Sequence, residues 1–414
     1  FYRKTETEFI LQDEYDSFYK LAAVLSNILI HRIIVVSDNQ GVINDNSEIN
    51  DMSYRKFQQK SIDRLYYINK VFSVGRISVK LILVVQNAQI VDGTESSLHP
   101  EHIQIQNLGK TIGMENPGWI SKTIDIGTGL SIHTIYEEIM SPVQPETVAY
   151  RQGRRYVEKI TSINPTPYIK SPIGIKEGGV YLLTGGLGGL GLAFASRLST
   201  ARTKLILVGR MGLPEREKWE QILKSEEDAV MCRKIRTIQE CEKNGAEVLI
   251  CCADVADYQA MNQVIKEILS RFGALHGVFH MAGVGVGQTG SLLWSSDKSI
   301  FDEVSRAKVL GCCVLGALTA SISLDFFVLF SSPITYLGGK GTLSYASANA
   351  FLDAYADYLN HSGRYALSIG WAPWEETVKS MGDTFVPEKQ LFHVLSTSEI
   401  LDGFMQMLGC RSSR

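Results

Sequence analysis

The chain has 414 residues, a formal net charge of −3 and 45% hydrophobic residues, which are ordinary values for a globular protein. The near-neutral charge argues against a nucleic-acid partner and against a membrane surface. No apolar run reaches the roughly 20 residues that a membrane span needs, and the length fits two or three domains of about 150 residues each.

The cysteines and histidines show no metal-ligand spacing. The seven cysteines form no CxxC pair, and the eight histidines are scattered along the chain. This pattern predicts neither a metal site nor a disulfide framework, and it favours the reducing cytoplasm. The chain begins at Phe1 without a basic and apolar leader, so we expect a piece of a longer protein.

Residues 1–165 show the alternation of apolar strands and helices that is typical of an α/β domain. Strand-like runs at Ile33–Val36 and Leu81–Val85 flank a helical pattern over residues 54–71. No glycine-rich turn follows either run, so we predict a domain that holds no nucleotide. Prolines in and around residues 166–177 predict an extended linker to the second half.

A glycine-rich turn follows the apolar run Val180–Leu183 and precedes the helical spacing of Leu192–Leu198. Strand, glycine turn and helix together bind the pyrophosphate of a dinucleotide, although an ordinary tight turn is the alternative. Glycine lets the backbone approach the phosphates, and the helix dipole favours their charge. The predicted cofactor-binding residues of the turn are Thr184, Gly185, Gly186, Leu187, Gly188, Gly189, Leu190 and Gly191.

Strand-like runs continue to alternate with helical patterns through the second half of the chain. They are Leu205–Val208, Ala246–Cys251, Gly277–His280, Asp325–Phe330 and Ala366–Gly370. This regular alternation predicts a doubly wound parallel sheet. We interpret the charged residues 215–243 as one or two solvated helices, not as a binding patch.

The end of the second strand indicates which dinucleotide binds. A domain that prefers NAD usually places Asp or Glu there for the ribose 2′-OH, but this strand ends at Gly209 and Arg210. Because a guanidinium suits a 2′-phosphate, we predict NADPH, with a surface arginine as the alternative. Asp254 follows the third strand, where its carboxylate can bind the adenine amine or simply form a turn.

A set of polar residues follows the fifth strand. Ser332 comes directly after Ser331, and Tyr345 lies thirteen positions later at the start of a helical run that places Asn349 on the same face. A tyrosine can protonate the alkoxide that forms when a ketone receives hydride. A free phenol holds its proton too tightly near neutral pH, and a nearby lysine ammonium favours the phenolate. A serine hydroxyl can hold the carbonyl oxygen.

Each of these residues also has an ordinary interpretation. Tyr345 can be a core tyrosine with a satisfied hydroxyl, Asn349 a polar helix residue and Ser332 a strand-end serine. It is their order along the chain, after a cofactor turn, that favours catalysis.

With these residues the chain resembles a short-chain dehydrogenase/reductase and, more closely, the ketoreductase domain of a modular polyketide synthase. Most short-chain reductases place Lys four residues after the Tyr, where this chain has Asn349. These ketoreductases carry the lysine on the preceding helix, and Lys308 matches that position. The resemblance implies that Tyr345 is the general acid and Lys308 its electrostatic partner. It also implies that Ser332 holds the carbonyl and that Asn349 organises a water.

Further landmarks of the family extend the resemblance over nearly the whole chain. Phe279–Val284 and Trp371–Trp374 match landmarks of the cofactor-binding half. Leu108–Ile112 and Glu115–Pro117 resemble the structural subdomain, a truncated Rossmann-like unit without cofactor. The further cofactor contacts that the resemblance implies are Val255, Met281, Ala282, Gly283 and Pro373.

The resemblance therefore implies a structural subdomain over 1–165, a linker over 166–177 and an NADPH-binding, Rossmann-like catalytic subdomain over 178–414.

Short motifs sort these ketoreductases by product configuration. One type carries Leu-Asp-Asp after the Ala-Gly-Val landmark, where this chain has Gly285–Gln288 without an acid. The other type often carries Trp eight residues before the Tyr, where this chain has Leu337. The missing acid favours an L-hydroxy product. Val378-Lys379 stands where the family shows Gly-Met, and Phe385–Phe392 is interpreted as a substrate-gating segment.

The predicted function is NADPH-dependent reduction of a ketoacyl group tethered to an acyl carrier protein. The carrier would be another domain of the same megasynthase, and the keto group can be α or β to the thioester. A redox-inactive or epimerising scaffold of the same fold is the main alternative. A free-standing reductase of small ketones and a pure interaction module, which would not bind NADPH, are further alternatives.

Overall fold

The computed structural model describes residues 2–3, 9–10, 32–37, 55, 57–72, 78–142, 144, 146–162, 173–283, 298–375 and 393–408. The chain divides into two compact units. The first comprises residues 1–160, 288–305 and 334–358, and the second comprises residues 161–287, 306–333 and 359–414. Two segments of the second half of the chain thus pack with the first unit, and the subdomain boundaries expected from the sequence stay a prediction.

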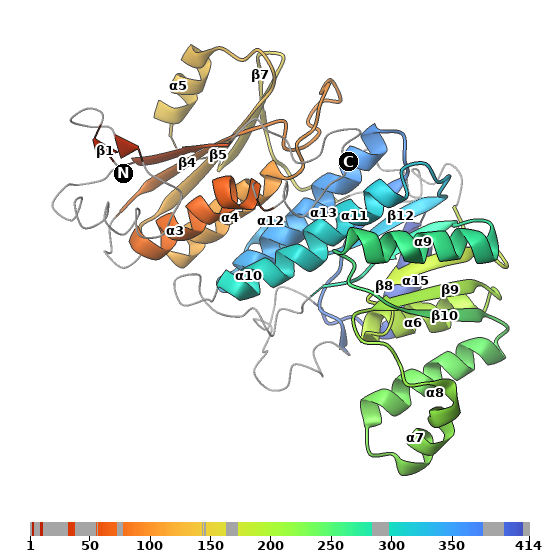
Figure 1. Cartoon of the computed structure of the whole chain (residues 1–414). Helices are drawn as coiled ribbons and strands as arrows, with labels where there is room; N and C mark the ends of the chain where they lie inside the picture. The colour runs from red at the N-terminus through yellow and green to blue at the C-terminus, as the bar shows by residue number, and fades with distance from the viewer. Residues whose placement is uncertain are drawn as a thin grey trace. The chain divides into compact units, whose positions relative to one another are not determined.

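The first unit contains a sheet of mostly parallel strands (Figure 1). In order across the sheet they are β3 (Arg32–Val36), β4 (Lys80–Gln86), β5 (Ile120–Ile126), β6 (Thr147–Arg151) and β7 (Arg154–Val157). Only the β6–β7 pair is antiparallel among these described strands. The strands predicted at 33–36 and 81–85 are confirmed. A separate antiparallel pair joins β1 (Tyr2–Arg3) to β2 (Phe9–Ile10).

Helices of the first unit come from both halves of the chain. They are η1 (Gln58–Ile62), α3 (Asp63–Phe72), α4 (His102–Glu115), α5 (Ile132–Met140), α10 (Lys298–Ser305), α12 (Ile334–Leu337) and most of α13 (Leu343–His361). η1 and α3 confirm the helical pattern predicted over 54–71. A Cβ on Gly109 of α4 would overlap the side chains of Leu83 and Ser121. Glycine here lets α4 approach β4 and β5 closely.

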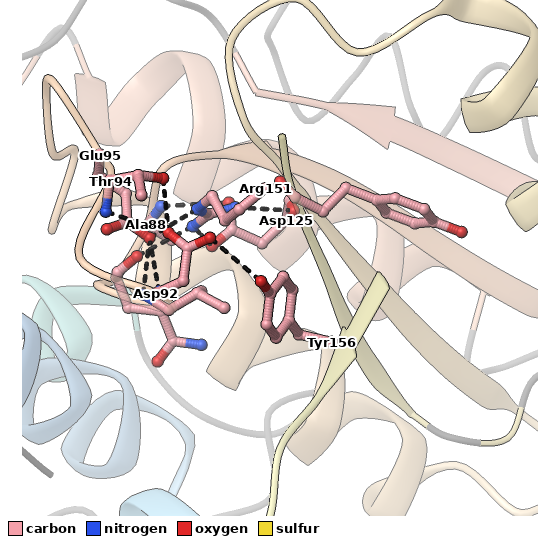
Figure 2. Close-up of polar contacts among 10 residues, drawn as sticks. Ala88, Asp92, Thr94, Glu95, Asp125, Arg151 and Tyr156 are labelled. Carbon is pink, nitrogen blue, oxygen red and sulfur yellow. Dashed lines mark hydrogen bonds and ion pairs between the residues drawn. The ribbon is translucent and has the colours of Figure 1, made fainter. Parts of the chain in front are cut away.

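A buried ion cluster lies at the carboxyl ends of β5 and β6 (Figure 2). The Arg151 guanidinium contacts Glu95 Oε1 at 2.8 Å through Nε and Asp125 Oδ2 at 2.7 Å through Nη2. Burial would raise the pKa of Glu95, but backbone hydrogen bonds and Arg151 hold it below its usual value. Asp125 is more deeply desolvated, and burial raises its pKa. The cluster therefore ties the loop after β4 to the sheet.

The second unit contains a parallel sheet in the order β10-β9-β8-β11-β12-β13 (Figure 1). These strands are β8 (Val180–Thr184), β9 (Lys204–Gly209), β10 (Glu247–Cys252), β11 (Gly277–His280), β12 (Phe326–Ser331) and β13 (Ala366–Gly370). This order is that of a doubly wound Rossmann-like sheet, so the predicted fold class is confirmed. The strand order reverses between β8 and β11, where Leu182 is paired with Val278.

Helices pack around the second sheet. They are α6 (Gly189–Ser199), η4 (Arg216–Lys218), α7 (Trp219–Ser225), α8 (Ala229–Lys243), α9 (Tyr258–Phe272), η6 (Arg306–Leu310), α11 (Gly311–Leu318) and α15 (Thr397–Met407). α7 and α8 confirm the helices predicted over 215–243. Phe194 of α6 packs edge-on against Phe404 of α15, with ring centroids 5.1 Å apart, and close to Phe279 of β11. This aromatic core supports the strand ends that hold the site.

Candidate active site

The glycine turn after β8 is held by its own backbone. Gly186 N donates to Val208 O at 3.2 Å, and Gly188 N donates to Gly185 O at 2.9 Å. A Cβ on Gly186 would lie 2.7 Å from Leu183 O, and one on Gly191 would overlap Gly185 and Gly186. Gly185 has a φ of +69° and would bring a Cβ within 3.0 Å of Ala282 N. Backbone proximity therefore demands glycine at three positions of the predicted turn.

The N-terminus of α6 is open to a ligand. Its N-cap is Gly188, and no side chain caps the helix. A Cβ on Gly189 would meet no atom within 4 Å, so the space beside the first turn is empty. The other residues of the predicted turn, besides its glycines, are Thr184, Leu187 and Leu190. Exposed N–H groups at a helix N-terminus suit a phosphate, so these residues fit a dinucleotide pyrophosphate.

Cations lie beside this turn in the same unit. A surface pocket is lined by Leu187, Gly188, Gly189 and Leu192 of the turn and α6, and by Ala229, Val230, Arg233 and Lys234 of α8. Arg210 follows β9 and is exposed. The charged composition of α8 predicted only a solvated helix and gave no sign that two of its cations line this pocket.

The ends of β9 and β10 lie side by side. Ala253 N donates to Gly209 O at 3.0 Å. Asp254 Oδ1 accepts from Ala256 N at 2.9 Å, and its Oδ2 lies 3.4 Å from Arg306 Nε. Asp254 therefore forms a turn through Oδ1 and an ion pair with Arg306 through Oδ2, and its contact with adenine stays a prediction. Val255 is buried against Gly311, whose added Cβ would lie 2.7 Å from Val255 Cγ1.

His280, the last residue of β11, connects the glycine turn to the predicted catalytic lysine. Its Nε2 lies 3.1 Å from Lys308 O, and its Nδ1 lies 2.9 Å from Thr184 Oγ1. Because a carbonyl only accepts, Nε2 carries the proton, and Nδ1 accepts from the Thr184 hydroxyl. Burial lowers the pKa of His280 to about 3, so the ring is neutral at pH 7. The sequence indicated His280 only as the end of a predicted strand and as part of a family landmark.

Lys308 lies in η6 and points to the end of β12. Its Nζ donates to Phe330 O at 3.0 Å, and the residue is buried. A Cβ on Gly283 would lie 2.9 Å from Lys308 Cε, so glycine makes room for the lysine side chain. Ser332 follows β12 directly and is partly buried. The second unit thus brings Lys308 close to Gly283 and to the last residues of β12.

Two more predicted cofactor contacts, Met281 and Ala282, lie next to the glycine turn. Met281 N donates to Thr184 O at 3.2 Å, and Ala282 N donates to Thr184 Oγ1 at 3.4 Å. Pro373 lies after β13 and accepts a hydrogen bond from Leu395 N at 2.9 Å. All three positions therefore follow the carboxyl ends of β11 and β13, the edge at which doubly wound sheets bind ligands.

Tyr345 and Asn349 lie in the first unit, one turn apart on α13. Asn349 is fully buried, and its Nδ2 donates to Tyr345 O at 2.7 Å. Tyr345 is partly exposed. The amide of Asn349 therefore contacts the backbone of Tyr345, the residue for which it was predicted to organise a water. The catalytic roles of both residues stay predictions.

Several predictions fall outside the described residues. These are the stereochemical motif at Gly285–Gln288, the lid residues Val378-Lys379, the gating segment Phe385–Phe392 and residues 166–172 of the linker. Leu337 ends α12 and is exposed. Within the described part of the chain, no helix is long and apolar enough to cross a membrane.

Comparison with known proteins identifies the family. Residues 179–376 match the family model of the KR domain. The chain belongs to the ketoreductase domains of modular polyketide synthases. It is 32% identical to polyketide synthase PksL of Bacillus subtilis over 66% of this chain, which spans 6% of that relative.

Solved structures of two ketoreductase-containing proteins resemble the whole chain. The N-terminal ketoreductase from the macrolactin assembly line aligns over 97% of this chain and 76% of its own, with a TM-score of 0.74 and 26% identity. A keto acid-selecting NRPS module with adenylation, ketoreductase and pseudo Asub domains aligns over 99% of this chain and 34% of its own, with a TM-score of 0.85 and 20% identity. Membership of the ketoreductase family implies an oxidoreductase that acts on ketones with a nicotinamide cofactor.

Proposed function

We propose that this ketoreductase uses NADPH to reduce a ketoacyl group, tethered to an acyl carrier protein, to the hydroxyacyl group. The observation that carries the proposal is the hydrogen-bonded path from Thr184 through His280 to Lys308. It joins a turn that fits a dinucleotide to a lysine of the type that supports proton transfer.

The residues around the turn favour NADPH over NADH. The backbone N–H groups of α6 fit the pyrophosphate, and Arg210 stands at the end of β9, where no acidic residue follows immediately in the sequence. Arg233 and Lys234 add positive charge to the pocket beside the turn. Three cations here suit the extra 2′-phosphate. When bound, the nicotinamide cofactor supplies hydride to the carbonyl carbon.

The chain's own residues then handle the proton. We infer that the Ser332 hydroxyl donates a hydrogen bond to the carbonyl oxygen and holds it for reduction. As hydride reaches the carbon, the oxygen takes the phenolic proton of Tyr345 and becomes the product hydroxyl. The Lys308 ammonium stabilises the phenolate that is left. Asn349 supports a water that returns a proton to Tyr345.

The relatives support the proposed partner and indicate which substrates to test. The chain spans 6% of the length of PksL, so we infer that it works beside other domains of a megasynthase, one of them the acyl carrier protein, in the cytoplasm. The similar NRPS module is described as keto acid-selecting, whereas the other similar protein is a macrolactin ketoreductase. Both an α-keto and a β-keto substrate are therefore tested.

The experiment measures NADPH oxidation with a β-ketoacyl and an α-ketoacyl carrier thioester. Tyr345→Phe should lower the rate about 100- to 10,000-fold and leave the Kd for NADPH unchanged. Tyr358→Phe removes the same atom from the same helix and serves as the control.

Each other outcome selects an alternative. Equal rates for Tyr345→Phe and the unmodified chain would remove Tyr345 from the chemistry. Binding of NADPH without oxidation of either thioester would favour an epimerising domain. Absence of NADPH binding would leave a scaffold.

A further inference from the structure

One face of α4 carries buried polar side chains that the proposed function does not use. Gln104, Asn107, Thr111 and Glu115 are all buried and recur at intervals of three or four residues, which places them on one side of the helix. The glycine side of α4 packs against β4 and β5 at Gly109. Buried polar groups normally have hydrogen-bond partners, so the partners of the polar face of α4 indicate the role of that face.

Three side chains of α4 hold the chain segment that runs from α12 to the start of α13. Asn107 Nδ2 donates to Thr335 O at 2.8 Å. Lys110 Nζ donates to Tyr336 O. Glu115 Oε1 accepts from Gly341 N at 2.9 Å. All of these residues lie in the first unit. We call Asn107, Lys110 and Glu115 the α4 clamp.

The clamped segment has little conformational preference of its own. Gly338, Gly339 and Gly341 lie within four positions, and Gly338 and Gly341 have φ values of +67° and +74°. Glycine is the residue with the widest backbone freedom, so such a segment is costly to order. A Cβ on Gly338 would lie 2.6 Å from Met114 Sδ, which brings the segment close to α4 at a fourth point. Contacts with other residues of the first unit, those of α4 among them, therefore fix the path of this segment.

The segment leads directly into the helix of the predicted proton donor. Gly341 is four residues before Tyr345, and α13 begins at Leu343. Further along α13, Ser347 Oγ donates to Gln104 O at 3.5 Å, so α4 also contacts the helix itself. Contacts before and after Tyr345 restrict both the position and the rotation of the first turn of α13.

We propose that the α4 clamp positions Tyr345 for proton transfer, which makes Asn107, Lys110 and Glu115 positioning residues of the reaction. The proposal rests on the proposed function of Tyr345. It assigns a role in catalysis to a helix that lies outside the cofactor-binding fold. Small displacements of a reacting group are costly, since misplacement by about 1 Å can reduce a rate roughly 100-fold.

The test removes the carboxylate of Glu115, which accepts from Gly341 N, in the unmodified chain and in the Tyr345→Phe variant. Glu115→Ala should lower kcat about tenfold while the Kd for NADPH stays unchanged. Glu115→Gln keeps an acceptor oxygen and should stay within about twofold of the unmodified chain. In the Tyr345→Phe background, Glu115→Ala should change the residual rate by less than about twofold, because coupled residues are not additive. Glu137→Ala, an exposed acid of α5, is the control.

The outcomes separate this inference from the proposed function. An equal loss from Glu115→Ala in both backgrounds would show a general structural effect and overturn the clamp. A loss in Glu115→Gln as large as in Glu115→Ala would exclude the hydrogen bond as the cause. If Glu115→Ala does not fold, Lys110→Met keeps the aliphatic stem and should lower kcat about threefold, again only when Tyr345 is present. An unmodified chain that binds NADPH but reduces neither thioester would overturn the proposed function itself.

Discussion

The two parallel sheets of this protein differ most at their carboxyl ends. In the first unit, the guanidinium of Arg151 lies between the carboxylates of Glu95 and Asp125 at the ends of β5 and β6 (Figure 2). In the second unit, β8 runs into a glycine turn whose following helix has no side-chain cap. One edge pairs buried charged side chains with one another, and the other begins a helix whose first N–H groups have no side-chain cap.

This difference shows how one architecture serves two purposes. Parallel strands direct their carboxyl ends to the same edge in both units, but a phosphate site also needs backbone that can approach the ligand. In the second unit, Gly185, Gly186 and Gly191 let the turn pack tightly against its own backbone and that of Ala282. In the first unit, glycine at Gly109 brings a helix close to the strands. Glycine thus permits close backbone packing in both units, within a turn in the second and between a helix and strands in the first.

The largest effect should come from breaking the ion cluster of the first unit. Arg151→Met leaves Glu95 and Asp125 buried without their cation and should lower the free energy of unfolding by about 3–5 kcal/mol. Urea-induced unfolding measures this change in the free energy of unfolding. Arg154→Met, at an exposed neighbouring position, should change that free energy by less than about 0.5 kcal/mol. Equal stability of the two variants would mean that the cluster is not what stabilises this edge.

The next effect concerns the glycine turn. Gly191→Ala places a Cβ against the backbone of Gly185 and Gly186, which must shift. We expect the Kd for NADPH to rise about 10- to 100-fold, which corresponds to about 1–3 kcal/mol. Gly113→Ala in α4 meets ordinary contacts, the nearest at 3.5 Å from Ser121 Cβ, and should leave the Kd unchanged. Fluorescence titration with NADPH measures the Kd of both variants. Unchanged binding in Gly191→Ala would remove the turn from the cofactor site.

His280 should make the stability of the second unit depend on pH. Burial lowers its pKa to about 3, so below the unfolded value of about 6.5 the unfolded state binds more protons. Stability should therefore be fully present above pH 6.5 and fall towards pH 3, by up to about 1.4 kcal/mol per pH unit. His99 acts in the opposite sense, because its hydrogen bond with Glu101 raises its pKa.

The measurement for His280 compares unfolding curves of the unmodified chain and His280→Gln between pH 7.5 and pH 5. The contribution of His99 is present in both proteins and cancels in the difference. The unmodified chain should lose more stability over this range, and parallel slopes would contradict the neutral, buried state of His280.

The smallest effect concerns the choice of nucleotide. Arg210→Ala should raise the Kd for NADPH about fivefold and leave the Kd for NADH unchanged, because an exposed ion pair contributes up to about 1 kcal/mol. The difference should shrink as salt screens the charge. Lys218→Ala, an exposed cation of η4, is the control. An equal rise for both nucleotides would remove Arg210 from recognition of the 2′-phosphate.

The sequence predicted the second unit better than the first. Strands buried on both faces read as continuous apolar runs, so all the strands of the second sheet were found. β7 was missed because it begins with the charged residues Arg154 and Arg155. β5 and β6 were missed because Lys122, Asp125 and Arg151 interrupt their apolar pattern. Those side chains are buried in ion pairs that link distant parts of the chain, and no local pattern records such pairing.

The candidate site divides in the same way. The glycine turn, Lys308 and the end of β12 were named from motifs, but the His280 connection was not. Thr184 and His280 are 96 positions apart and meet only because β8 and β11 are neighbours in the sheet. The α4 clamp joins residues 226 or more positions apart, and its polar side chains had no distinguishing pattern.

The sequence by itself determined the fold class, the positions of most strands and the position of the glycine turn, and it supplied the hypothesis of proton transfer. Periodicity and glycine placement are local properties, and these features depend on them. The tertiary structure decided which side chains meet: His280 with Lys308, Arg151 with Glu95, and α4 with the segment before Tyr345. Such contacts depend on strand order and helix packing, which arise from the summed interactions of the whole chain rather than from any one segment.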